Sequence, residues 1–163
     1  MKKILFIRHA KSLNGDYKLI DHDRPLSDRG ISDAEMMSER LLEKNIIPEK
    51  FISSSAKRAL KTAEIIKNRL NKNLEIQIEE KIYYNGRDGV ENVISNTTDN
   101  LNFIVIFGHN PTFESIYCDI TNSSYAKFPT CAITLCTFDV DKWNNFSIKG
   151  SKIEYYDYPK NIK

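Results

Sequence analysis

The stretch NFIVIF at residues 102–107 decides the fold: its β-branched and aromatic residues predict a strand, and Gly108-His109 follow directly. A similar run, KILFI at residues 3–7, predicts a second strand that is buried on both faces, and it ends at Arg8-His9. Two apolar strands that each stop at a histidine therefore indicate both the fold and the chemistry of this chain.

Helices and strands alternate along the rest of the chain. Strands are expected near residues 50–53, 75–79, 132–140 and 153–158, the second of them near a sheet edge. Helices are expected after the N-cap Ser27, over residues 59–70 and 88–95, and from Asn110-Pro111, as N-cap and first helical residue, to about residue 119. The alternation predicts an α/β fold with a mostly parallel sheet. Because no linker interrupts it, residues 1–163 are expected to form one domain.

The composition is that of an ordinary globular protein, and it excludes several classes of function. A formal net charge of +2 over 163 residues is too small to indicate nucleic acid or a membrane surface as a partner. Cys118, Cys131 and Cys136 lack the spacing of a metal site, which predicts free thiols buried in a reducing cytosol. The apolar run before Arg8 is too short for a signal peptide or a membrane span, so a cytoplasmic protein is expected.

Basic side chains follow three of the predicted strands. Arg8-His9 follow the first strand, Arg58 follows the strand near residues 50–53 through a serine-rich loop, and His109 follows the strand at 102–107. Ligands of open α/β sheets bind outside the carboxyl ends of the strands. Parallel strands would therefore bring these groups to one sheet edge, where helix N-termini also favour an anion. Guanidinium groups bind phosphoryl oxygens in pairs, and a neutral imidazole can attack phosphorus.

Four blocks of sequence carry a resemblance to a known family. They are LFIRHAKS at 5–12, DRPLSDRG at 23–30, SSSAKRALKTA at 53–63 and IVIFGHNP at 104–111. In order and spacing they resemble the histidine phosphatase (phosphoglycerate-mutase-like) superfamily, and within it the short, SixA-like phosphohistidine phosphatase branch. The resemblance implies a three-layer α/β/α fold with a phosphoglycerate-mutase-like sheet.

The resemblance also implies roles for single residues. His9 corresponds to the nucleophile, and Arg8, Arg58 and His109 to the groups that bind the phosphoryl oxygens. Arg24 corresponds to a loop at the pocket mouth, which implies either a secondary phosphate contact or a loop salt bridge with Asp21 or Asp23.

Other positions match the family less closely. Asn14 lies one residue before the asparagine that contacts phosphate in mutase relatives, and Ala56 replaces the usual proline of its block. Glu80 precedes Ile82-Tyr83, which resembles the "LY" of the branch; Glu80 is therefore either the general acid or a solvated carboxylate at a strand end. His22, between two aspartates, is interpreted as a loop residue.

These residues predict a metal-independent hydrolase without a cofactor. In-line attack by His9 on a phosphomonoester or a protein phosphohistidine would give phospho-His9, which water then hydrolyses, while arginine and histidine supply the charge that a metal would bring. The expected partner is a phosphorylated protein or small phosphomonoester. Two alternatives remain open: a phosphate-binding or phosphoprotein-binding module without turnover, and a small-molecule phosphomutase. The mutase is the weaker alternative because residues 63–101 offer little chain for a closing lid.

Overall fold

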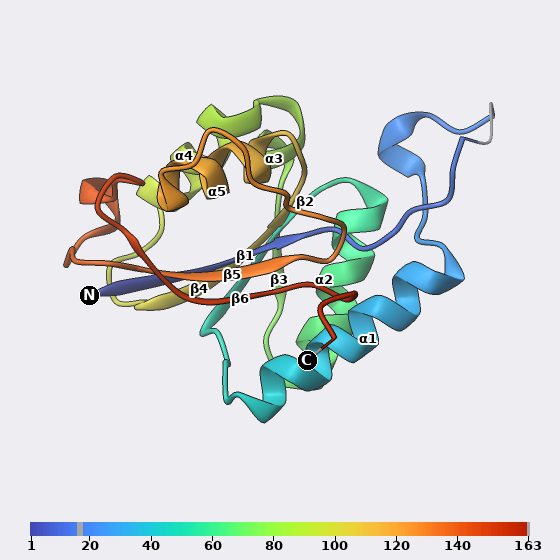
Figure 1. The fold of residues 1–163 in the computed structure, drawn as a ribbon, viewed down its shortest axis with the longest axis horizontal. Coiled ribbons are helices and arrows are strands. Elements are labelled where there is room, and N and C mark those ends of the chain that lie inside the picture. The colour runs from blue at the N-terminus through green and yellow to red at the C-terminus, as the bar shows by residue number, and fades with distance from the viewer. Residues whose placement is uncertain (16–17, 163) are drawn as a thin grey trace.

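The structure, a computed structural model, describes residues 1–15 and 18–162. In this part of the chain six strands form one sheet in the order β3-β2-β4-β1-β5-β6 (Figure 1). The strands are β1 (Lys2–Arg8), β2 (Lys50–Ser54), β3 (Ile76–Glu79), β4 (Phe103–Gly108), β5 (Ile133–Phe138) and β6 (Lys152–Asp157). The two strands that end at a histidine, β1 and β4, are central neighbours, and β3 lies at an edge as predicted.

The sheet is mostly parallel, which confirms the predicted fold class. Strands β3, β2, β4 and β1 pair in parallel, and their carboxyl ends therefore lie at the same edge. Strand β5 runs antiparallel to β1, and β6 runs antiparallel to β5. Strand β5 is shorter than expected, since it begins at Ile133 and ends at Phe138, whereas β6 has the expected length but begins and ends one residue earlier, at Lys152 and Asp157.

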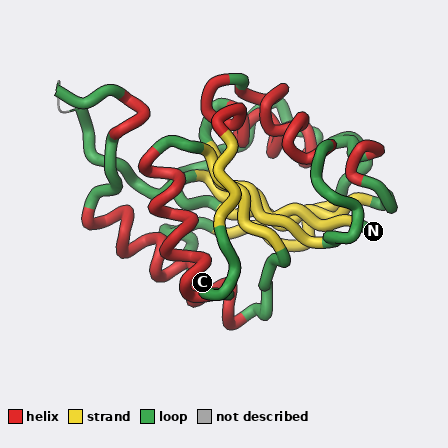
Figure 2. Tube along the Cα trace, turned by 180° about the vertical axis from the view of Figure 1, so that it is seen from behind, coloured by secondary structure: helices red, strands yellow, loops and turns green. Residues whose placement is uncertain are grey.

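Helices cover both faces of the sheet and complete three layers (Figures 1 and 2). Helices α1 (Asp28–Glu43) and α2 (Lys57–Leu70) pack against one face, and α3 (Glu80–Tyr84), α4 (Gly86–Ser95) and α5 (Thr112–Thr121) lie on the other. Two short 3₁₀ helices, η1 (Asp21–Asp23) and η2 (Trp143–Asn145), lie in the connections. None of the described helices is both long and apolar enough to cross a membrane.

The alternation of side chains along β1 explains why both faces are apolar. Ile4 and Phe6 belong to the core cluster under α4 and α5, whereas Leu5 and Ile7 belong to the cluster under α1 and α2. All four side chains are buried. Because successive residues of a strand point to opposite faces, a strand covered on both sides reads as a continuous apolar run.

The start of α1 packs tightly against the loop that follows His9. The Ser27 hydroxyl accepts a hydrogen bond from Gly30 N at 3.1 Å, which confirms the predicted N-cap, and donates one to Lys11 O at 3.0 Å. A Cβ atom at Gly30 would lie 2.0 Å from Lys11 O, so only glycine allows this approach. The contact fixes the backbone just beyond His9.

Two predicted helix starts are corrected by the structure. Helix α5 begins at Thr112, with Pro111 as its N-cap after a cis Asn110–Pro111 peptide, so Pro111 is not the first helical residue. The Asn110 side chain does not cap the helix: its Nδ2 donates to Phe128 O at 2.9 Å, and its Oδ1 accepts from no backbone N–H of the described residues. Helix α4 begins at Gly86, two residues before the predicted start at 88, because Asn85 already provides the N-cap position directly after α3.

Candidate active site

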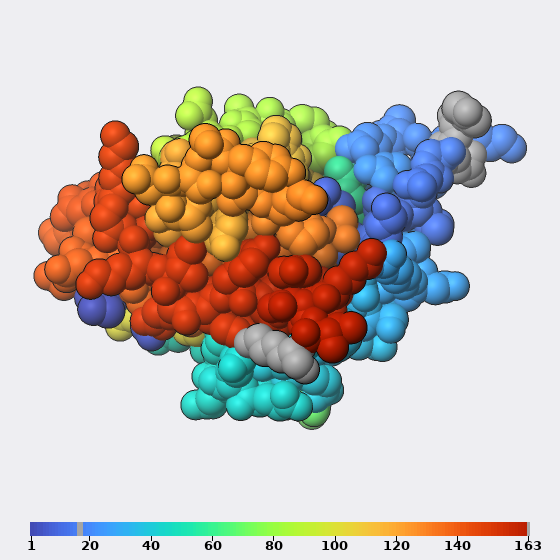
Figure 3. Space-filling view, in the orientation of Figure 1, coloured from blue at the N-terminus to red at the C-terminus, as the bar shows by residue number. Residues whose placement is uncertain are grey.

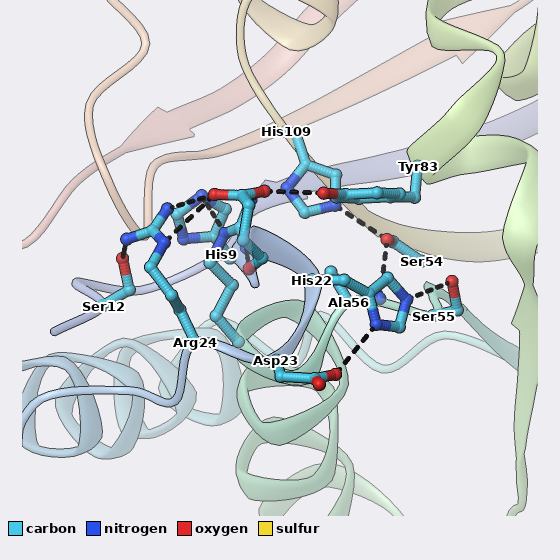
Figure 4. A network of polar contacts seen from close by, with 12 residues as sticks. His9, Ser12, His22, Asp23, Arg24, Ser54, Ser55, Ala56, Tyr83 and His109 are labelled. Carbon is cyan, nitrogen blue, oxygen red and sulfur yellow. Dashed lines mark hydrogen bonds and ion pairs between the residues drawn. The ribbon is translucent and has the colours of Figure 1, made fainter. Parts of the chain in front are cut away.

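The structure brings the predicted basic residues together at the carboxyl ends of three neighbouring strands. His9 follows β1, His109 follows β4, and Arg58 lies in the first turn of α2, just after β2. The centroids of the two imidazole rings lie 5.3 Å apart (Figure 4). Arg8, the last residue of β1, carries the fourth basic group. The parallel pairing of β1, β4 and β2 is what aligns these strand ends.

His9 has one unprotonated ring nitrogen, and its contacts identify which one. Its Nδ1 lies 2.7 Å from Ala10 O, and because a carbonyl oxygen only accepts, Nδ1 carries the proton. Its Nε2 accepts a hydrogen bond of 3.3 Å from Arg58 Nε. Burial lowers the pKa of His9 to about 3, assisted by the charges of His109, Arg58 and Arg8 and opposed by the bond to Ala10. The imidazole is therefore neutral at physiological pH, and its Nε2 lone pair accepts the hydrogen bond from Arg58.

His109 is oriented by a serine at the end of β2. Its Nε2 lies 2.7 Å from Ser54 Oγ, which also accepts a hydrogen bond from Ala56 N at 3.2 Å. With the Ser54 hydroxyl donating to His109 Nε2, the proton of a neutral His109 lies on Nδ1. Burial, followed by the charge of Arg58, lowers the pKa of His109 to about 4. In this tautomer the neutral ring is a donor through Nδ1.

Two buried donors in the site have no hydrogen-bond partner among the described residues. They are Arg8 Nε and His109 Nδ1. Arg8 is held by a hydrogen bond of 3.0 Å from its Nη1 to Phe128 O, and burial lowers the pKa of its guanidinium. Buried polar groups in proteins are nearly always paired, so these donors suit an oxyanion that accepts from both.

Asp21 connects the arginines of the site, and sequence analysis did not assign it a role in the pocket. Its carboxylate accepts from Arg58 Nη2 at 3.1 Å, from Arg24 Nη2 at 2.9 Å and from Tyr83 Oη at 2.7 Å, and its backbone oxygen accepts from Arg58 Nη1 at 2.8 Å. The hydrogen bond from Tyr83, followed by those from Arg24 and Arg58, holds the pKa of Asp21 well below its usual range against the opposing effect of burial. The carboxylate is therefore ionised.

Arg24 forms the loop salt bridge that the sequence offered as one alternative. Its guanidinium binds Asp21 and also donates to Ser12 Oγ at 2.7 Å and to Leu13 O at 3.1 Å (Figure 4). Arg24 is linked to Arg58 through Asp21.

The other two predicted residues lie away from this network. Asn14 is exposed on the loop after β1, and Glu80 is exposed at the first position of α3. Among the described residues, no side chain forms a hydrogen bond or an ion pair with either of them.

The ring of Tyr83 lies between His109 and His22 and contacts both. The Tyr83 ring is 5.5 Å from His109 and 4.9 Å from His22, both edge-to-face. His22 lies 2.9 Å from Ser55 Oγ and 3.3 Å from its neighbour Asp23, as expected for a loop residue (Figure 4). Tyr83 belongs to the block that resembles the "LY" of the branch, but the sequence did not predict it as a site residue. No three His, Cys, Asp or Glu side chains of the described chain cluster as a metal site would require.

Comparisons with known proteins agree with this geometry. The model of the histidine phosphatase superfamily (branch 1) matches residues 4–83. An uncharacterised chloroplastic protein of Arabidopsis thaliana is 28% identical over 159 residues, covering 91% of this chain and 72% of that protein. An uncharacterised protein of Mycobacterium leprae is 24% identical over 168 residues, covering 94% of this chain and all of that protein.

Solved structures show the same fold. SixA from Agrobacterium tumefaciens superposes with a TM-score of 0.81 at 20% identity, covering 97% of this chain and 98% of that one. A protein histidine phosphatase SixA complexed with tungstate gives 0.79 at 19% identity, with 99% of both chains covered. Phosphoserine phosphatase from Entamoeba histolytica gives 0.68 at 15% identity, covering 96% and 97%. The first half of this chain therefore matches the histidine phosphatase superfamily (branch 1), and nearly the whole chain shares the fold of the SixA proteins.

Proposed function

We propose that this protein is a metal-independent phosphatase that forms a phosphohistidine intermediate on His9. The match to the histidine phosphatase superfamily supports phosphatase activity. The observation that carries the finer proposal is the unprotonated Nε2 of His9, directed at Arg58 and adjacent to His109. A neutral imidazole held beside fixed positive charge combines a nucleophile with groups that stabilise phosphoryl oxygens.

The reaction proceeds in two balanced steps. In the first, a bond forms between His9 Nε2 and phosphorus while the bond from phosphorus to the leaving group breaks, and the leaving group takes up a proton from solvent water. In the second, water attacks the same phosphorus, releasing inorganic phosphate and the free imidazole. Arg8, Arg58 and the Nδ1 proton of His109 hold the equatorial oxygens in both steps. The two arginines supply the positive charge that a bound metal supplies in other phosphatases.

The substrate we propose is a phosphomonoester or protein phosphohistidine whose leaving group needs little help from an acid. Asp21 is ionised and cannot donate a proton, and Glu80, the predicted general acid, is exposed at the start of α3. The imidazole of a phosphohistidine and the phenolate of an aryl phosphate are better leaving groups than an alkoxide. Their departure therefore depends less on proton donation. Tungstate, which the similar SixA structure contains, is a phosphate-like oxyanion that we expect the same donors to bind.

The test is hydrolysis of an aryl phosphate in the presence of a chelator. Wild-type protein should turn over, and His9→Ala should lose activity by several orders of magnitude. His22→Ala is the matched control, since His22 is the third histidine of the chain and should keep activity within a few fold. Full activity of His9→Ala would contradict the proposal. Binding of phosphate by wild-type protein without any turnover would instead identify a phosphate-binding module.

We place this activity in the cytoplasm. Cys118, Cys131 and Cys136 are all free, and the last two are buried, which suits a reducing compartment. Cys118 is only partly buried, whereas the sequence predicted three buried thiols.

A further inference from the structure

A groove lies on segments of the chain that adjoin the catalytic residues. This groove, of about 800 Å³, is formed by the loop after β1, the start of α1, the end of β6 and the segment between α5 and β5. On the face shown in Figure 3, the orange segment after α5, the red C-terminal segment and the blue N-terminal segment border one another. The groove is too large for a single phosphate ion, so it suits a longer ligand.

The groove carries an excess of positive charge. Four cationic side chains line it, namely Lys11, Arg29, Lys127 and Lys160, against one carboxylate, Asp33. Arg29 is 3.6 Å from Asp33, so these two charges offset each other. The three lysines are exposed and form no ion pair with any described residue. Since the whole chain has a net charge of only +2, this concentration of free lysines is a local feature.

The walls of the groove are hydrogen-bonded to the catalytic residues. Phe128 O accepts from Arg8, and Cys131 N donates to His9 O at 3.0 Å, while Lys127 and Thr130 of the same segment line the groove. Lys11 follows His9 by two residues. A ligand in the groove therefore lies against segments that also hold Arg8 and His9.

The chemistry of the walls favours a peptide over a nucleic acid. Tyr117 and Tyr156 stack on each other with their centroids 4.6 Å apart, and the Tyr156 hydroxyl donates to Lys127 O at 2.9 Å. These rings cover one another rather than offering free faces on which bases stack. The free cations are lysines, which act as point charges, whereas the phosphate pocket uses the planar forks of Arg8 and Arg58. Separate point charges match carboxylates spaced along a flexible chain.

We propose that this groove binds an acidic segment of a phosphorylated protein substrate, next to the residue that carries the phosphoryl group. The inference rests on the proposed phosphatase function and adds the substrate class. It predicts that a peptide rich in Glu and Asp binds even without a phosphoryl group, because the groove recognises the flanking charges.

The experiment is fluorescence anisotropy with a labelled, unphosphorylated peptide rich in Glu and Asp, and with its Gln and Asn counterpart. Wild-type protein should bind the acidic peptide and not the neutral one. The double variant Lys127→Glu/Lys160→Glu should weaken binding by roughly tenfold, as expected for reversing two rim charges. Lys61→Glu/Lys67→Glu, on the exposed face of α2, changes the net charge equally and should bind like wild type. Matching circular dichroism spectra exclude misfolding as the cause.

The inference is overturned if the acidic peptide does not bind, if both double variants lose binding equally, or if an oligonucleotide of equal charge displaces the peptide at lower concentration. Because binding is measured without turnover, the two proposals fail separately. A protein that hydrolyses an aryl phosphate but ignores the peptide refutes the groove alone. One that binds the peptide but hydrolyses nothing refutes the phosphatase alone.

Discussion

The Nε atom of Arg58 lies 3.3 Å from the Nε2 atom of His9 and donates a hydrogen bond to it. The bond uses the Nε2 lone pair and so fixes the orientation of the imidazole, and it places a permanent charge beside the atom that would become attached to phosphorus. When that N–P bond forms, Arg58 can transfer its hydrogen bonds to the phosphoryl oxygens. Orientation of the nucleophile and stabilisation of charge thus depend on one side chain.

Replacing Arg58 by alanine should lower kcat/KM for an aryl phosphate by roughly 100- to 1000-fold, the range found when one oxyanion-binding donor is removed. Arg69→Ala is the control, because Arg69 lies on the same helix, is exposed and binds only Glu39. The control should be indistinguishable from wild type in steady-state kinetics. Equal activity of both variants would mean that Arg58 takes no part in the chemistry.

The pH profile should show that His9 stays neutral well into the acid range. Its pKa is lowered from 6.5 to about 3, so the nucleophilic form is lost only as the pH falls toward that value. After correction for ionisation of the substrate, kcat/KM should be flat between about pH 7.5 and about pH 5. A tenfold loss for each unit below about 6.5 would show an ordinary histidine instead.

The same shift requires a control for unfolding. Below pH 6.5 His9 is protonated in the unfolded chain but stays neutral in the folded protein, because burial lowers its pKa. Each histidine with such a lowered pKa therefore reduces the free energy of unfolding by about 1.4 kcal/mol for every pH unit below 6.5. Circular dichroism at each pH separates this effect from the titration of the active enzyme.

Removing the charge of Asp21 should tighten binding of inorganic phosphate several-fold. The Asp21 carboxylate occupies Arg58 Nη2 and faces any anion that enters the pocket. In Asp21→Asn one side-chain oxygen still accepts and the amide nitrogen cannot, so the donors at one of the two positions lose their partner. The backbone oxygen still accepts from Arg58 Nη1 and holds that arginine in position. Isothermal titration with phosphate measures the change, with Asp23→Asn as the neighbouring control. Weaker binding in Asp21→Asn would show that orientation of Arg58 outweighs repulsion.

Gly30→Ala should destabilise the protein by about 1–3 kcal/mol, the usual effect of overpacking. The added Cβ would lie 2.0 Å from Lys11 O, so the loop after His9 or the start of α1 must shift. Gly15→Ala is the control because a Cβ there meets no atom within 4 Å. Urea unfolding gives both values, and an unchanged stability of Gly30→Ala would contradict this packing.

The central part of the site could be predicted because its residues directly follow apolar strands. His9 and His109 end runs whose burial is visible in the sequence, and parallel pairing aligns them with Arg58. Asp21 and Tyr83 could not be located in the same way. Asp21 lies in a loop far from Arg58 in sequence, and only the tertiary fold brings its carboxylate to Arg58 and to the Tyr83 hydroxyl.

The starts of helices and the ends of strands were harder to predict from the sequence, because they also depend on contacts between distant segments. Asn110 followed by Pro111 is typical of a helix start, but the Asn110 side chain binds Phe128 O, a partner eighteen residues later. Strand β5 pairs with β1 in the antiparallel direction. The partner of a strand and the direction of pairing depend on the tertiary fold, so the sequence of β5 alone does not predict them. Glu80 looked like an acid by spacing alone, and the role of this exposed residue stays a prediction.

The most direct test of the central claim is to trap the phosphorylated enzyme. Wild-type protein is mixed with an aryl phosphate, stopped in alkali, where phosphohistidine survives, and digested for mass spectrometry. The account predicts a phosphoryl group on His9, absent from His9→Ala and lost when the enzyme is allowed to complete its turnover. A phosphoryl group on His109 or His22, or rapid hydrolysis with no phosphorylated residue at any time, would contradict it.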